Sequence, residues 1–148
     1  MTNEPIFEWN EETGTAKCTV SYKNKKIQGV AICHPDDKDM QSKLTGQEIA
    51  KRRAKIECYI HIKENEILPK IEILNHLIGT MTHSKNFNPK SYEIKRVRAE
   101  LQNLKDDLTT INEELAEERV GLKLFLVQKD AFYKQIRTRR AKIDKNHN

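Results

Sequence analysis

The stretch that decides the fold runs from residue 94 to residue 143 and reads IKRVRAELQNLKDDLTTINEELAEERVGLKLFLVQKDAFYKQIRTRRAKI. Its apolar residues recur at steps of three and four, the heptad pattern of a helix that packs along one side. The sequence therefore predicts one long helix over residues 90–145, which needs a partner along its apolar stripe. The a and d positions hold Ile94, Val97, Leu101, Leu104, Leu108, Ile111, Leu115, Leu122, Phe125, Phe132, Ile136 and Ile143, with interruptions at Glu118, Lys129 and Arg139.

An earlier helix is predicted over residues 45–82. Its start, Thr45-Gly46-Gln47-Glu48, has the form of a capping box, and apolar residues at helical spacing follow. Pro69 lies inside this helix and has no amide hydrogen, so we expect a kink or a break near residues 65–68. The two helices are expected to fold back on each other as an antiparallel hairpin with its turn at residues 83–90.

Residues 6–34 predict a small β-meander, because apolar and polar residues alternate there between recognisable turns. Gly14 is expected in the first turn with positive φ, and Gly29 is expected to mark a bulge or a close approach by another element. Such a sheet is not stable alone. The predicted fold is therefore a single α-rich α+β domain over residues 1–148, in which a three-stranded antiparallel meander packs on a long antiparallel helical hairpin or coiled coil.

The segment 122–127 is apolar on more than one side of its helix, which a two-helix seam does not explain. We therefore expect either the sheet or another subunit against residues 122–136. Residues 99–118 carry seven acids and one base, whereas residues 119–148 carry nine bases and two acids. Neighbouring blocks of opposite sign favour an antiparallel or staggered meeting of two copies, so a homo-oligomer is expected.

The composition narrows the class of protein. Hydrophobic residues make up 36% of the chain and charged residues 33%, with a net charge of +5. No stretch approaches the ~20 consecutive apolar residues of a membrane span, and the first residues are acidic where a secretory signal would be basic. The three cysteines, Cys18, Cys33 and Cys58, fit reduced thiols better than a disulfide framework. We therefore expect a cytoplasmic protein without a membrane partner.

Two basic clusters are the sharpest candidates for binding an anion, a nucleic acid or an acidic partner. One is predicted on the first helix and the other near the end of the second. No recognition helix or stacking aromatic pattern accompanies them, and cations near a helix C-terminus are expected from the helix dipole alone. Nucleic-acid binding is therefore kept as an alternative. The residues in question are Lys51, Arg52, Arg53 and Lys55 in the first cluster, and Arg137, Arg139, Arg140, Lys142 and Lys145 in the second.

Metal and enzyme chemistry have weaker signals. Cys18, Cys33, His34, Cys58 and His61 are suitable metal-ligand types, but the paired CxxC spacing of a structural zinc site is absent. The chain has no phosphate-binding Gly-rich loop, no GxSxG elbow and no HExxH motif. The sequence therefore predicts no enzyme, no metal and no cofactor.

The run Gly29-Val30-Ala31-Ile32-Cys33-His34-Pro35-Asp36-Asp37-Lys38-Asp39, followed by Ser42, Gly46, Ile49-Ala50 and Arg53-Ala54, resembles a pattern in small accessory proteins of phages and prophages of Gram-positive bacteria. The resemblance covers residues 29–54. It implies a protein that works in the host cytoplasm by binding a host enzyme, a defence component or a signal molecule. It also makes His34, Asp36, Asp37, Arg52 and Arg53 candidate contacts.

We therefore expect a non-enzymatic protein that binds a host protein, with an inhibitory or counter-defence role. A nucleic-acid binder is one alternative to this function. A sponge for a small anionic ligand held between subunits is another.

Overall fold

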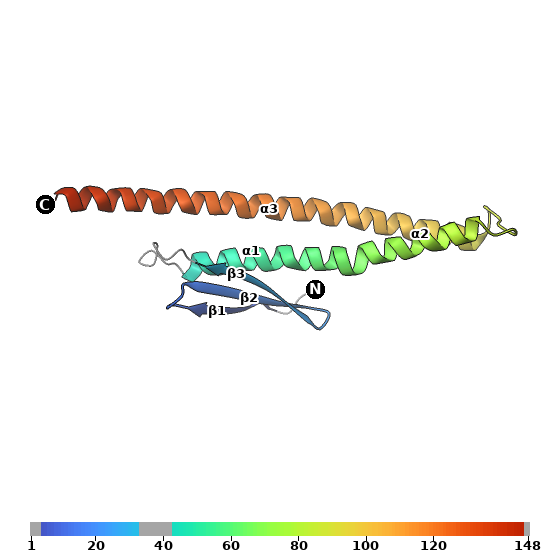
Figure 1. Cartoon of the computed structure of the whole chain (residues 1–148), viewed down its shortest axis with the longest axis horizontal. Coiled ribbons are helices and arrows are strands. Elements are labelled where there is room, and N and C mark those ends of the chain that lie inside the picture. Colours follow the sequence, from blue (N-terminus) through green and yellow to red (C-terminus); the bar gives the residue numbers. More distant parts are fainter. Residues whose placement is uncertain (1–3, 33–42, 147–148) are drawn as a thin grey trace. The chain divides into compact units, whose positions relative to one another are not determined.

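The computed structural model describes residues 4–32 and 43–146, which belong to two compact units. Unit 1 comprises residues 1–57 and 117–148, and unit 2 comprises residues 58–116. The predicted α-rich α+β class is confirmed, with a three-stranded antiparallel sheet followed by long helices (Figure 1). The elements are β1 (Ile6–Asn10), β2 (Thr15–Tyr22), β3 (Lys25–Ile32), α1 (Lys43–Ile62), the π-helical turn η2 (Lys63–Ile67), α2 (Leu68–Thr82) and α3 (Tyr92–Asn146).

The sheet has the order β1-β2-β3, and its two turns explain its register. In the first turn Asn10 Oδ1 accepts hydrogen bonds from the amides of Glu12 and Thr13, at 3.0 and 3.3 Å. Gly14 has a positive φ, as predicted, and its value is 66°. In the second turn Lys23 and Asn24 both have positive φ, at 43° and 65°, which suits the twist of a two-residue hairpin.

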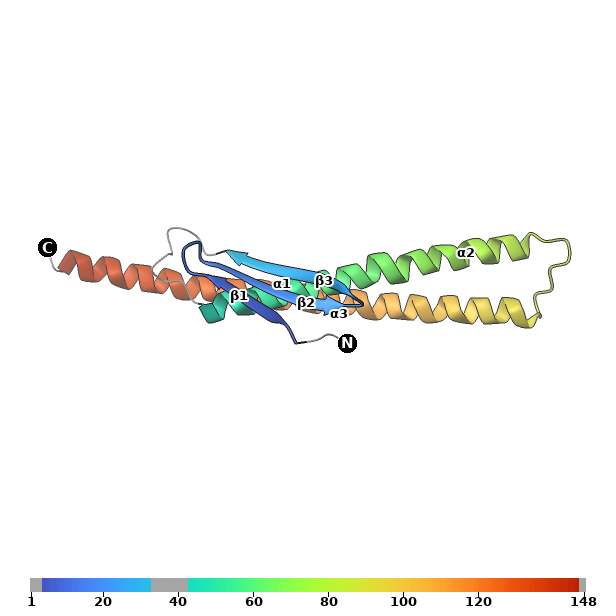
Figure 2. The same cartoon turned by 90° about the horizontal axis from the view of Figure 1, so that it is seen from below.

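The face of β2 that was predicted to be apolar packs on α1 in unit 1. Ala16 and Cys18 from β2, Ala31 from β3, and Ala50 and Ala54 from α1 form one buried cluster. All five side chains are small, so the backbones of helix and sheet come close together. Figure 2 shows the sheet lying along α1.

Gly29 marks the closest approach between these layers. A β-carbon at this position would lie 2.1 Å from the backbone oxygen of Ala50 and 2.3 Å from the backbone nitrogen of Ala54. Position 29 therefore has no room for any side chain, and of the two roles predicted for Gly29 the close approach is the one observed.

The part of α3 that belongs to unit 1 lies on the opposite side of α1 from the sheet, so this unit has three layers (Figure 1). The sheet does not cover the outer side of residues 122–136, which was one of the two expectations for this segment. Leu124 remains 57% exposed and Val127 59% exposed. Tyr133 does line a cavity of about 70 Å³ together with Trp9 and Ile32.

Unit 2 is the closed end of a helical hairpin, formed by residues 58–82 and residues 92–116. The heptad pattern is confirmed there, since Ile94, Val97, Leu101, Ile111 and Leu115 are all buried. Ser91 caps the start of α3, because the amide of Ile94 donates to Ser91 Oγ at 3.4 Å.

The break predicted near Pro69 is a π-helical turn. The amide of Leu68 donates to the carbonyl oxygen of Lys63, a bond that spans five residues and closes η2. Pro69 then falls in the first turn of α2, where its missing amide hydrogen leaves no bond unmade.

The capping box predicted at Thr45 is wrong. Lys43 is already helical, so Thr45 lies inside α1, and Glu48 instead accepts a hydrogen bond from Arg52 Nε at 3.1 Å. The second helix, predicted over residues 90–145, is observed as the unbroken α3, from Tyr92 to Asn146.

Candidate protein-binding surfaces

The side of α3 that faces α1 is held by charged and aromatic side chains. Lys55 Nζ lies 2.8 Å from Glu118 Oε1, and the guanidinium carbon of Arg52 lies 5.2 Å from the centre of the Phe125 ring. Gly121 leaves space for Arg52, because a β-carbon there would lie 3.2 Å from Arg52 Nη1. Pairs of this kind link α1 to α3 with modest energies, about 0.5–1 kcal/mol for an exposed cation over a ring.

Two of the three polar interruptions of the heptad pattern make side-chain contacts, one with α1 and one within α3. Glu118 pairs with Lys55, and Lys129 Nζ lies 5.5 Å from the centre of the Phe125 ring and 5.9 Å from that of Phe132. Charged residues at a and d positions are therefore accommodated at the edge of the helix pair, where their charges stay partly solvated.

The first basic cluster lies in unit 1, and three of its four members make contacts within the chain. Arg52 and Lys55 face α3, as described above, whereas Arg53 Nη1 donates a hydrogen bond to the carbonyl oxygen of Val30 at 2.7 Å. Lys51 is exposed. These contacts tie α1 to the layers on both sides of it.

The second basic cluster lies further along α3. Arg137 and Arg139 are exposed, and the side chain of Arg140 lies outside the described part of the chain. Arg137 follows Phe125 by twelve residues, or about 18 Å along the helix, so the structure does not bring the two clusters together. The predicted contacts His34, Asp36 and Asp37 also lie outside the described residues.

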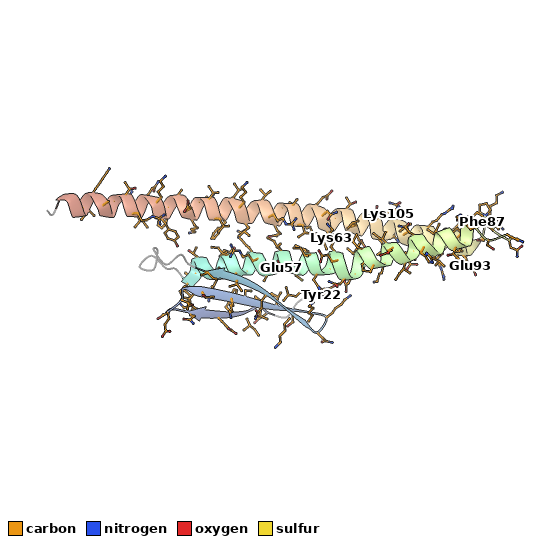
Figure 3. The ribbon with its side chains drawn as sticks, in the orientation of Figure 1. Tyr22, Glu57, Lys63, Phe87, Glu93 and Lys105 are labelled. Atoms are coloured by element: carbon orange, nitrogen blue, oxygen red, sulfur yellow. The ribbon has the colours of Figure 1, made fainter. Side chains whose placement is uncertain are left out.

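The outer side of α3 in unit 1 carries an apolar stripe at helical spacing, here called the α3 stripe and defined as Val120, Leu124, Val127 and Ala131. The first three side chains are 57%, 57% and 59% exposed, and Ala131 is exposed as well. Figure 3 shows side chains projecting from α3 both toward α1 and away from it. The α3 stripe is the second apolar side that the sequence indicated for residues 122–127.

A second exposed surface lies on α2 in unit 2, here called the α2 face and defined as Ile73 and Leu77. Their exposed fractions are 65% and 41%, whereas Leu68, which is 40% exposed, lies on another side of the helix. Seven of the fifteen residues of α2 are Leu, Ile or Met, yet none of its residues is buried. The sequence analysis missed this face because it considered only the one apolar stripe of this helix, which does not include Ile73 and Leu77, although these two residues are one turn apart.

The thiols of the described cysteines are not poised for reaction. Cys18 and Cys58 are both buried and free. Burial raises the pKa of Cys18, an effect that Lys51 partly opposes, and burial together with the charge of Glu66 raises the pKa of Cys58. At neutral pH both thiols are protonated, whereas a reactive cysteine needs a thiolate.

Within residues 4–32 and 43–146, no group of three or more His, Cys, Asp or Glu side chains is arranged to hold a metal ion. An open concavity of about 760 Å³ lies at the β1–β2 turn. It is polar, and no arginine lines it or the 70 Å³ cavity beside Tyr133. No helix in the described part of the chain is long and apolar enough to cross a membrane.

Comparison with protein-family models, with curated proteins and with solved structures finds no match to this chain. The function is therefore argued from the surfaces themselves.

Proposed function

We propose that this chain is a non-enzymatic binding protein that docks on another protein through the α2 face. The observation that carries the proposal is that α2, rich in leucine and isoleucine, buries none of its residues. Exposed aliphatic side chains gathered on one side of a helix are typical of protein interaction sites.

The spacing of the α2 face favours one mode of recognition. Ile73 and Leu77 are one helical turn apart, so both can enter the same apolar groove of a partner, as in helix-in-groove complexes. The partner is therefore expected to be a protein with a groove lined by aliphatic side chains.

The resemblance of residues 29–54 to phage accessory proteins adds the class of partner, a host protein in the host cytoplasm. An inhibitory or counter-defence role follows from that class. Self-association is part of the same proposal, because the α3 stripe is a separate exposed apolar surface on the opposite side of α3 from its contacts with α1.

Site-specific photo-crosslinking in an extract of a Gram-positive host tests the docking surface. A benzophenone amino acid replaces His76, an exposed residue on α2, or Lys17, an exposed residue on the sheet. We expect a discrete adduct from position 76 and none from position 17. The adduct should be lost in the Ile73→Glu/Leu77→Glu variant and kept in Leu124→Glu, which changes the other surface. Equal adducts from both positions, or none from position 76, would contradict the proposal.

Nucleic-acid binding is the second candidate, supported by the exposure of Arg137 and Arg139 on α3. Binding through these residues would weaken steeply as salt rises, because phosphate contacts release counterions. Titration of DNA and RNA at rising salt, with Arg137→Ala/Arg139→Ala beside the wild type, separates the two candidates. The absence of binding at low salt removes this one. The anionic-ligand alternative is tested by thermal shift with nucleotides, with Arg52→Ala/Arg53→Ala as its control.

A further inference from the structure

The α3 stripe lies on the side of its helix that α1 does not use. At about 100° per residue, Leu124 and Val127 lie about 100° to 160° around the helix from Phe125 and Lys129, which contact each other on the α1 side. All four stripe residues belong to one continuous helix. The stripe is therefore an apolar surface of about three helical turns that stays exposed in the described part of unit 1.

The spacing of the stripe is the same in both directions. Its members are separated by four, three and four residues, so reversing the helix reproduces the pattern. Two such helices placed antiparallel would match Leu124 with Val127 of a second copy, and Val120 with Ala131 of that copy. These are the alternating layers of an antiparallel coiled coil.

We propose that a second copy of this chain covers the α3 stripe, with the two α3 helices antiparallel and the twofold axis passing between residues 125 and 126. The inference rests on the proposed self-association and adds its interface, orientation and register. A twofold interface of this kind uses one patch on both molecules, which the symmetric spacing of the stripe allows.

The charges at the ends of the stripe fit this register. Glu117 and Lys134 are the next positions along the same side, one turn before Val120 and one turn after Ala131, and both are exposed. In the antiparallel pair Glu117 of one copy meets Lys134 of the other, and symmetry repeats the contact. Lys123 and Asp130, both exposed, form a second pair of opposite charges on the flank of the seam.

A parallel pair in register would place like charges together instead. Glu117 would face Glu117 of the other copy, and Lys134 would face Lys134, at positions that point into the seam. Like charges so placed are unfavourable, and a mismatch of this kind selects one orientation over another. The charge pattern therefore favours the antiparallel pair and favours a second copy over an unrelated apolar partner.

Sedimentation of the full chain over a range of micromolar concentrations tests the proposal. The wild type is expected to dimerise, and Leu124→Glu is expected to weaken dimerisation about tenfold or more, because it puts an unpaired charge in the centre of the seam. Ile73→Glu is the matched control, since it places the same charge on the α2 face, and it should dimerise as the wild type does.

Each outcome of this experiment decides a different point. A wild type that stays monomeric overturns both the self-association and its interface. A dimer that Leu124→Glu leaves intact, or that Ile73→Glu disrupts equally, overturns the interface alone.

Exchange of charges tests the orientation and uses substitutions at exposed sites. Glu117→Lys and Lys134→Glu should each weaken the dimer by about two- to tenfold, and the double variant should restore it, because the opposite charges then meet again in reversed order. Single variants that dimerise as well as the wild type would contradict the antiparallel register.

Discussion

At the scale of single residues, the contact between helix and sheet depends on side chains that are absent or small. Gly46, Ala50 and Ala54 recur every four residues along α1, and Ala50 and Ala54 are fully buried against the sheet. A search for large apolar residues passes over this stripe, which is why the sequence analysis assigned the helix to the hairpin seam alone. A four-residue repeat of small residues is the signal that would have located the sheet on α1.

Substitution of Gly29 tests this contact. Gly29→Ala places a methyl group against the backbones of Ala50 and Ala54, which cannot move aside as a side chain would, so the free energy of unfolding should fall by roughly 2–4 kcal/mol. Gly79→Ala is the control, because a β-carbon at this position meets no atom within 4 Å and alanine favours a helix. Its free energy of unfolding should rise by about 0.5–1 kcal/mol. Urea unfolding measures both. Equal effects of the two substitutions would count against the close packing.

At the scale of elements, the spacing of apolar residues and the residue types in the turns determine most of what could be predicted. The three-stranded meander and the continuity of α3 follow from local patterns, and the structure confirms them. The π-helical form of η2 does not follow from sequence, because a proline predicts an irregularity without fixing its geometry. Which side of α2 stays exposed depends on how the other elements of its unit pack, and local sequence patterns do not report that packing.

The π-helical turn behaves as one extra residue in an otherwise regular helix, which gives a second prediction. Deleting Asn65 together with Pro69→Ala should convert η2 to regular α-helix while keeping the apolar sides of α1 and α2 aligned. The free energy of unfolding should then change by about 1 kcal/mol or less. Deleting the exposed Asn112 in the same Pro69→Ala background should lower the free energy of unfolding by several times that amount. This deletion rotates one part of the α3 heptad pattern by about 100° against the other. Two deletions of equal cost would contradict this account of η2.

At the scale of the whole molecule, aliphatic side chains are divided between a buried core and exposed surfaces. Among the described residues, Ile94 and Cys18 are the largest side chains that are fully buried, whereas aliphatic residues remain exposed on α2 and on the outer side of α3. Apolar area of this kind is stabilising only when a partner removes it from water. We propose that the α2 face contacts a different protein and that the α3 stripe contacts a second copy.

Distances between two copies give the most direct test of this division. In the proposed antiparallel pair, equivalent residues are separated along the helix axis by about 3 Å for every residue between that position and the twofold axis, because each copy contributes about 1.5 Å. Spin labels at Arg119 should therefore lie roughly 20 Å apart along the axis, and labels at Lys142 about 50 Å apart. Both positions are exposed, and a Cys33→Ser background leaves only the buried thiols of Cys18 and Cys58 beside each label. Pulsed electron resonance measures both distances. Short and equal distances at the two sites would indicate a parallel pair, whereas the expected lengthening toward the C-terminal end requires that the two α3 helices run in opposite directions about residues 125 and 126.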